Sequence, residues 1–211
     1  IPSRGLVISA SEVDDRDMPA RSALNIYAYQ KASAAYPTLQ SADRSDGTPI
    51  PWAAMSGLAA AADGKTVYGV EDSFFGGNRI FGIDVSLQPA VIRSELTIRD
   101  TDGHFAAFKA TLPLAKDDQA FDQDDVAKMI NQDGSVNIDP EGIAVASSGG
   151  FWVASEGAGS KTSYETGRNI TNANLIFKVS ATGVIERVIP LPAAMNNMQA
   201  RFGFEGVTEH N

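Results

Sequence analysis

The strongest constraint on the fold of this chain is a short β-hairpin that occurs twice, each time with acids at its open end. Residues 139–157 read as an apolar strand, a turn of small residues and a second apolar strand. Residues 56–72 follow the same pattern. In an antiparallel hairpin, the residue that opens the first strand lies beside the residue that closes the second. We therefore expect Glu141 and Glu156 on the same side of the second hairpin.

Each hairpin continues into two further apolar segments. Residues 79–85 match residues 174–179 as a third strand, and residues 90–96 match residues 184–189 as a fourth strand. Each copy is thus predicted to be a four-stranded antiparallel meander. Phe204-Glu205-Gly206 repeats the opening of the hairpin, so a third copy is expected to start there.

These repeats predict an all-β fold, a β-propeller built from four-stranded antiparallel blades. A single sheet with apolar residues on both faces cannot bury itself, so it must stack on neighbouring sheets. The blades are expected near residues 56–98 and 141–190, with a third starting at residue 204. Because a propeller needs at least about four blades to close, residues 1–211 are expected to be the N-terminal part, about half, of a single propeller domain. The remainder is expected C-terminal to residue 211.

The segments outside the blades carry weaker signals. Residues 5–10 and 24–29 are predicted strands, because β-branched and aromatic residues are frequent in them. Residues 31–52 contain three prolines and an Asp-Gly pair, which predict a long irregular connection. Residues 122–130 begin with acids and carry apolar residues at helical spacing, so a short helix is expected on the rim of the propeller.

The composition excludes several classes of function. A net charge of −9 and a pI of about 4.6 argue against nucleic-acid binding, which needs clustered Lys and Arg. No stretch approaches the ~18 apolar residues of a membrane span. The absence of cysteine excludes disulfides and thiolate metal sites. The chain opens with Ile1-Pro2 rather than Met, which is consistent with a removed signal peptide or with a start that lies outside this sequence. We expect the first, an exported protein that is periplasmic or secreted.

Four acids are predicted to meet at one mouth of the propeller channel. The first strand of each blade lines the channel and the second packs outside it, so the start of the first and the end of the second share that mouth. Converging carboxylates raise one another's pKa unless a cation neutralises them. Hard oxygen ligands, with no cysteine and only two histidines in the chain, favour Ca²⁺ over Zn²⁺. The predicted metal ligands are Glu141, Glu205, Glu156 and Asp72. In the alternative reading, these acids cap strand ends and bind backbone amides or arginines.

No catalytic residue is identified from the sequence. There is no Gly-x-Ser-x-Gly motif. The two candidate general bases, His104 and His210, are expected in a loop and at the end of the chain, and the alternative is that each is simply solvated. Basic residues that follow the second strands are candidates for contact with an anionic substrate: Arg79, Lys161 and Arg168. Residues 100–103 and 131–139 resemble calcium loops but lack the flanking helices and the final Glu of an EF-hand, so plain turns are the alternative.

Three segments resemble the "esterase-like activity of phytase" family. They are Asp-Pro-Glu-Gly-Ile-Ala at 139–144, the aromatic strand with its terminal Glu at 150–157, and Gly-Phe-Glu-Gly-Val-Thr at 203–208. The resemblance spans about residues 50–211. It implies an exported, bacterial-type β-propeller, related in architecture to calcium-dependent phytases, that hydrolyses phosphate or other esters.

The resemblance also assigns site residues. Glu141, Glu156 and Glu205 match the acidic motif positions of the family. Asp72 matches the first acidic strand end more loosely, because Ser73 stands where the family commonly has Asn. The missing C-terminal part of the same protein would supply the remaining motifs.

The favoured function is calcium-assisted hydrolysis of a small-molecule ester or phosphoester at the channel mouth. Two alternatives stay open. One is a non-catalytic, calcium-stabilised propeller that acts as a binding or scaffold module. The other is a lactonase-like hydrolase, because sugar-lactone hydrolases also place metal carboxylates around a propeller axis.

Overall fold

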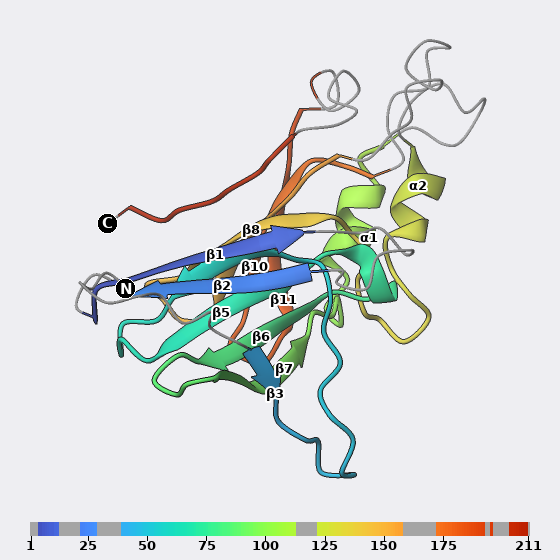
Figure 1. Cartoon of the computed structure of the whole chain (residues 1–211). Helices are drawn as coiled ribbons and strands as arrows, with labels where there is room; N and C mark the ends of the chain where they lie inside the picture. The colour runs from blue at the N-terminus through green and yellow to red at the C-terminus, as the bar shows by residue number, and fades with distance from the viewer. Residues whose placement is uncertain are drawn as a thin grey trace.

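The chain folds into sheets that are arranged like the blades of a propeller (Figure 1). The computed structural model describes residues 4–12, 22–28, 39–112, 122–157, 172–192, 195 and 203–210. The sheets are almost entirely antiparallel and helices are few, which confirms the predicted all-β, propeller-like class. Within the ranges that the structure describes, the sheets do not close into a ring.

The first full sheet is the predicted meander with one added strand. Its antiparallel core runs in the order β7-β6-β5-β4. Both faces are apolar: Phe81 and Ile83 pack on one side, and Val70 and Ile80 on the other. The four strands are β4 (Met55–Ala60), β5 (Thr66–Glu71), β6 (Arg79–Asp84) and β7 (Ala90–Thr97).

A fifth strand corrects the expectation that residues 31–52 are wholly irregular. Strand β3 (Leu39–Ser41) pairs in parallel with β7, so that Leu39 lies opposite Ala90 and Ser41 opposite Ile92. Its pairing is long-range and spans only three residues, so no alternating pattern marks it in the sequence. Residues 31–38 lie outside the described residues.

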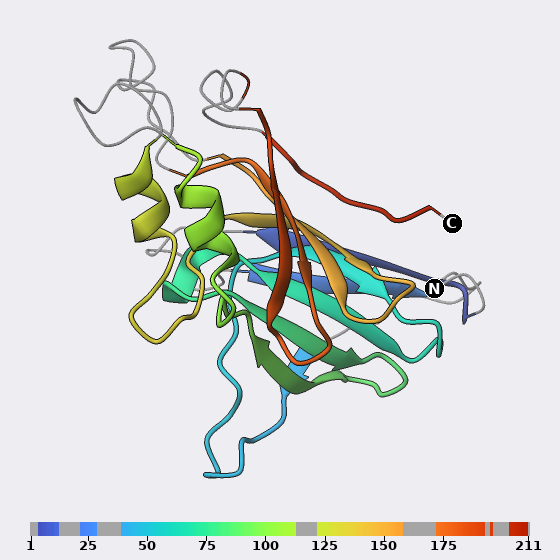
Figure 2. The ribbon, with the colours of Figure 1, turned by 180° about the vertical axis from the view of Figure 1, so that it is seen from behind.

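The second sheet repeats the same meander without an added strand, in the order β11-β10-β9-β8. Figure 2 shows this sheet in front of the first. The two sheets share one hydrophobic core, in which the Tyr68 ring meets the Phe151 ring edge-on at a centroid distance of 4.7 Å. The four strands are β8 (Pro140–Val145), β9 (Phe151–Ser155), β10 (Leu175–Val179) and β11 (Ile185–Pro190).

A two-stranded ribbon at the N-terminal end covers the other face of the first sheet. Strands β1 (Leu6–Glu12) and β2 (Ser22–Ala28) pair antiparallel, close to the two predicted strands. Leu24 is buried in a second core cluster together with Met55 and Phe81 of the first sheet. The first sheet is therefore packed on both faces, as a blade must be.

Short helices lie beyond the strand ends (Figure 1). Helix α2 (Gln123–Lys128) confirms the predicted rim helix, and the Asp122 and Asp125 side chains form a capping box at its start. Helix α1 (His104–Lys109) was not predicted, and it shows that the expected loop position of His104 is wrong. A 3₁₀ turn, η2, spans Ser73–Phe75. Among the described helices, none is long and apolar enough to cross a membrane.

The inner strands of successive repeats meet through glycines at equivalent positions. A Cβ on Gly57 would lie 3.0 Å from the Cα of Gly142, and a Cβ on Gly142 would lie 2.6 Å from the Cα of Gly206. Glu209, near the chain's end, accepts hydrogen bonds from the amide and hydroxyl of Ser147, in the turn that follows β8. Residues 203–210 thus run beside β8 in the same direction, although they form no strand.

Candidate functional site

Glu141 stands in a β-bulge at the start of β8. The register between β8 and β9 shifts between Pro140 and Gly142, which leaves Glu141 as the extra residue. The first sheet has the same shift between Met55 and Gly57, at Ser56. A bulge turns its extra side chain away from the regular alternation of the strand. The repeat therefore carries a built-in device for presenting a side chain at this end of the sheet.

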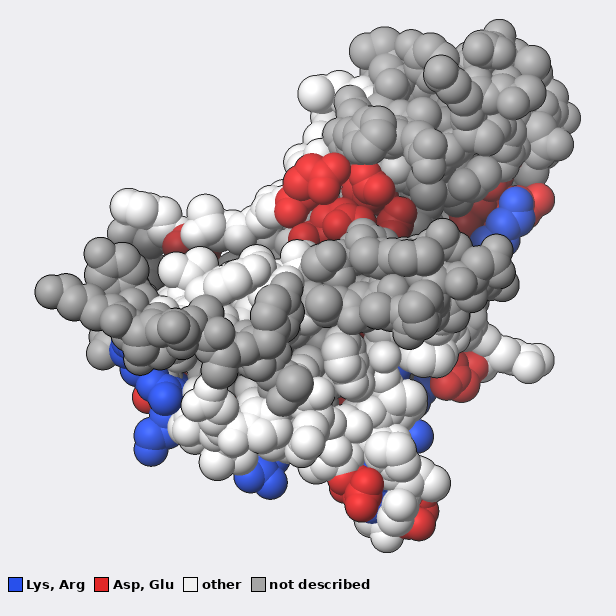
Figure 3. All heavy atoms as spheres, in the orientation of Figure 1, with Lys and Arg blue, Asp and Glu red and all other residues white. Residues whose placement is uncertain are grey.

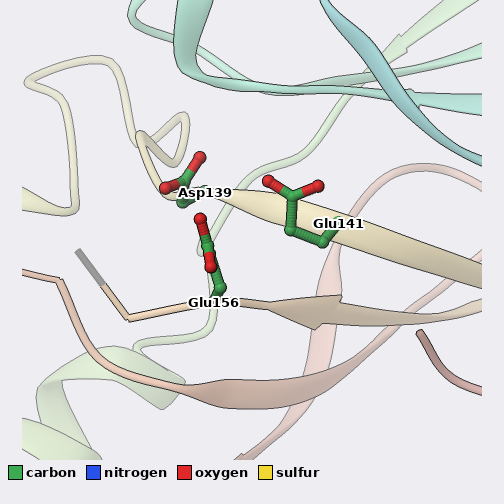
Figure 4. Close-up of side chains that lie close together, drawn as sticks. All are labelled: Asp139, Glu141 and Glu156. Atoms are coloured by element: carbon green, nitrogen blue, oxygen red, sulfur yellow. The ribbon is translucent and has the colours of Figure 1, made fainter. Parts of the chain in front are cut away.

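Asp139 directly precedes β8 and Glu156 directly follows β9, so both lie beside Glu141 at the open end of the same hairpin (Figure 4). The amide of Glu156 donates to the carbonyl of Asp139 at 2.9 Å, and the amide of Asp139 donates to the buried Ser155 hydroxyl at 3.1 Å. Carboxylate oxygens of Asp139, Glu141 and Glu156 all lie within 4.8 Å of one another, and all three residues are half-buried. Backbone pairing thus holds the three acids together.

Two further acids join this group from the neighbouring repeats. The Asp72 carboxyl is hydrogen-bonded to that of Asp139, and it also accepts the amide of Ser73 at the start of η2. Glu205 is exposed and its carboxyl is hydrogen-bonded to that of Glu156. We call these five residues the acidic cluster: Asp72, Asp139, Glu141, Glu156 and Glu205. In the space-filling view, acidic side chains gather in a patch above β8 (Figure 3).

Burial and, after it, the crowding of like charges raise the pKa values in the cluster. Burial, followed by the hydrogen bond and repulsion from Asp72 and repulsion from Glu141 and Glu156, raises the pKa of Asp139 to about 9. Burial and the charge of Glu156 raise the pKa of Glu205 as well. Without a cation, the cluster therefore keeps a proton at neutral pH. A divalent cation bound among these oxygens would replace that proton.

A family model described as phytase-like, "esterase-like activity of phytase", matches residues 50–211. This chain belongs to the phytase-like family. The predicted family resemblance is thus confirmed, and the match includes every member of the acidic cluster. No curated protein sequence matches this phytase-like chain.

One solved structure, a luciferin-regenerating enzyme, is similar to this phytase-like protein with a TM-score of 0.44 and 14% sequence identity. The similarity covers 89% of this chain and 43% of that one. This chain therefore spans less than half the length of that structure.

All four predicted ligands of the phytase-like protein lie in the acidic cluster, and their metal role stays a prediction. Asp139 is the member that the prediction omitted. Its position was interpreted as the end of a separate calcium loop at 131–139. The signal that points to it is its place at the mouth of the hairpin, where backbone pairing puts it beside Glu156.

Arg79 does not serve as the substrate-facing cation that the sequence suggested. Its guanidinium is buried and binds Glu71 at 2.7 and 2.8 Å and Glu95 at 2.6 Å. It also lies 5.1 Å from the ring centre of Phe75 and 5.0 Å from that of Phe81. Burial raises the pKa of Glu71 to about 6 despite this pairing. Lys161 and Arg168, the other two candidates, lie outside the described residues.

In the two segments that resemble calcium loops, aspartate carboxylates accept hydrogen bonds from the protein's own amides and hydroxyls. The Asp100 carboxylate accepts the amides of His104 at 2.8 Å and Phe105 at 3.0 Å, so it caps α1. The Asp133 carboxylate accepts the amide and hydroxyl of Ser135 within a turn. These contacts favour the alternative that both runs are turns. The second histidine, His210, is exposed near the end of the chain.

Proposed function

We propose that this phytase-like protein hydrolyses small phosphate or other esters with the help of Ca²⁺ bound at the acidic cluster. The observation that carries the proposal is the convergence of Asp139, Glu141 and Glu156 within 4.8 Å, with Asp72 and Glu205 attached at either side. Membership of a family described by esterase-like activity supports the reaction class.

The donor set fits calcium. Ca²⁺ binds six to eight oxygens at about 2.3–2.6 Å, so two of its ligands lie at most about 5 Å apart. The oxygen spacing of 4.8 Å meets that limit. The cluster offers only carboxylates, the hard donors that Ca²⁺ prefers. Ser56 stands at the bulge position equivalent to Glu141, and its buried hydroxyl has no hydrogen-bond partner among the described residues. This hydroxyl is a further oxygen ligand for a cation, at the end of the first sheet that corresponds to the position of Glu141 in the second.

The protein side chains would prepare the site for the reaction. Bound Ca²⁺ would supply a Lewis acid that polarises the ester oxygen and activates water. Asp139 must release its proton before it can bind the ion, and the backbone bonds from Ser155 and Glu156 keep it in place as it does so. Glu205 lies at the exposed edge of the cluster, where a substrate would approach.

The test compares hydrolysis of p-nitrophenyl phosphate and p-nitrophenyl acetate in EDTA and in added CaCl₂. We expect turnover that chelation abolishes and calcium restores, with a folded circular dichroism spectrum throughout. Glu141→Gln should raise the calcium concentration needed for half-maximal rate by at least tenfold. The matched control is Glu186→Gln on β11, where the carboxylate pairs with Lys178 at 3.0 Å. Turnover that is unchanged by EDTA would overturn the proposal.

A second candidate is a calcium-stabilised propeller without catalysis. Within the described ranges, Arg79 is the cation that was expected to meet an anionic substrate, but it pairs with Glu71 and Glu95 instead. This pairing favours the non-catalytic candidate. Calcium would then raise the melting temperature while neither ester is hydrolysed. We propose that either form works in the periplasm or outside the cell, where calcium modules bind with a Kd of about 10⁻⁴–10⁻³ M.

A further inference from the structure

A fully buried asparagine joins the two large sheets directly behind the acidic cluster. The Asn78 amide nitrogen donates to the carbonyl of Glu71 at 3.1 Å and to that of Ile138 at 3.0 Å. Its amide oxygen accepts the Ile138 amide at 2.8 Å. All three bonds go to backbone groups, two of them on a single residue of the other repeat. Asn78 therefore fixes the separation of two chain segments, whatever side chains those segments carry.

The two clamped segments carry a pair of acids that touch. Glu71 directly precedes Asp72, and Ile138 directly precedes Asp139. The carboxyls of Asp72 and Asp139 are hydrogen-bonded to each other across the sheet interface. The backbone of Asn78 adds to the same connection, since its amide donates to the carbonyl of Val136 at 2.9 Å. Asn78 thus joins the two segments that carry this acid pair.

A second asparagine occupies the same position in the next repeat. In the first repeat, Ile80 pairs with Val70, which lies two residues before Asp72. In the second repeat, Ile176 pairs with Ala154, which lies two residues before Glu156. The residues two positions before Ile80 and Ile176 are Asn78 and Asn174. Both asparagines are fully buried.

Asn174 lies between the corresponding segments of its own repeat. Its amide oxygen accepts the amide of Gly157 at 2.9 Å, and Gly157 directly follows Glu156. On its other side, Gly203 comes so close to this oxygen that a Cβ on Gly203 would not fit. Gly203 lies two residues before Glu205, just as Asp139 lies two residues before Glu141. Glu156 and Glu205 are the second hydrogen-bonded acid pair of the cluster.

We propose that Asn78 and Asn174 are positioning residues that set the spacing of the acidic cluster across successive blade interfaces. Asn78 sets the distance from Asp72 to Asp139, and Asn174 sets the distance from Glu156 to Glu205. The first test below rests on the proposed calcium site, because it measures calcium affinity. The second test is done in EDTA and does not depend on that site. Asparagine suits the task because one short side chain supplies both donors and an acceptor.

The first test measures the Kd of Ca²⁺ by isothermal titration calorimetry, at a temperature where every variant is folded. Asn78→Ala should raise the Kd at least tenfold. The control is Ile83→Ala, a fully buried change on β6 in the other core cluster, which should lower the melting temperature but leave the Kd within twofold. Equal and small changes in Kd for the two variants would show that Asn78 is only structural. If Asn78→Ala does not fold, Asn174→Ala is measured in the same way.

The second test needs no metal and still decides the matter if the wild-type protein does not bind Ca²⁺. In EDTA, Asp139→Asn should raise the melting temperature, because it removes a carboxyl that is buried and also crowded by its neighbours. In the Asn78→Ala background that rise should be measurably smaller, because the carboxyls can move apart and the part of the effect that comes from their crowding is relieved. The same rise in both backgrounds would overturn the positioning role. Absence of calcium binding in the wild type, by contrast, would overturn only the proposed function.

Discussion

Alanine substitutions at the three inner-strand glycines test whether main-chain contact sets the spacing of the repeats. Gly57, Gly142 and Gly206 occupy equivalent positions, and none has a positive φ, so alanine fits each backbone conformation. What differs is the space for a methyl group. A Cβ on Gly142 would lie 2.6 Å from the Cα of Gly206, whereas a Cβ on Gly206 would meet nothing within 4 Å.

The magnitudes follow from these distances. Ordinary contact begins at 3.4 Å, so Gly142→Ala requires the strands to part by about 0.8 Å and Gly57→Ala by about 0.4 Å. The obstructing atoms are main chain and cannot rotate away. Overpacking of this kind costs about 1–3 kcal/mol, which exceeds the gain of about 0.4–1 kcal/mol from stiffening the unfolded chain. Gly206→Ala should show only that gain.

Urea unfolding followed by tryptophan fluorescence measures the three free energies. We expect Gly142→Ala to be the least stable, Gly57→Ala intermediate, and Gly206→Ala at least as stable as wild type. For a chain of this length, each kcal/mol corresponds to about 2–4 °C in Tm. A Gly142→Ala variant as stable as Gly206→Ala would refute the reasoning, since the inner strands would then separate at little cost.

Two further predictions concern buried charge. The pKa of Asp139 is raised from 3.8 to about 9 in the folded protein. The folded protein therefore keeps a proton that the unfolded chain loses. In EDTA, the free energy of unfolding should fall as pH rises from about 4 to about 9. Thermal melts across that range check this, and a slope that survives in Asp139→Asn would contradict it. Arg79→Met should cost about 3–5 kcal/mol by leaving Glu71 buried and unpaired, while adding Glu71→Gln should recover most of the loss. A double variant as unstable as the single one in urea would refute this account.

The sequence alone predicted the blades and most of the acidic cluster, because both depend on local patterns. Apolar residues on both faces of four short strands indicate stacking, and the hairpin rule places Glu141 beside Glu156. Strand β3 was missed because it pairs with β7, some fifty residues away in the chain. The pairing of Arg79 with Glu71 and Glu95 was missed because side-chain direction is not visible in the sequence.

The bulge at Glu141 and the clamp at Asn78 were also beyond sequence analysis. A bulge is visible only in the register shift between two paired strands. Asn78 looks like an ordinary turn residue after Gly76-Gly77, yet it is fully buried. The sequence match of the third strands begins at Arg79 and Asn174, and only the strand pairing shows that Asn174 is equivalent to Asn78.

The acidic cluster takes its carboxylates from three consecutive repeats, which has a consequence for how the molecule assembles. A chain whose sheets have each formed, but have not yet come together, possesses only fragments of the site. An ion that needs all of the fragments binds the completed arrangement alone, and mass action then stabilises that arrangement at the expense of every partly assembled form. Under the proposed function, the calcium concentration around the protein would in this way control how firmly the sheets stay joined.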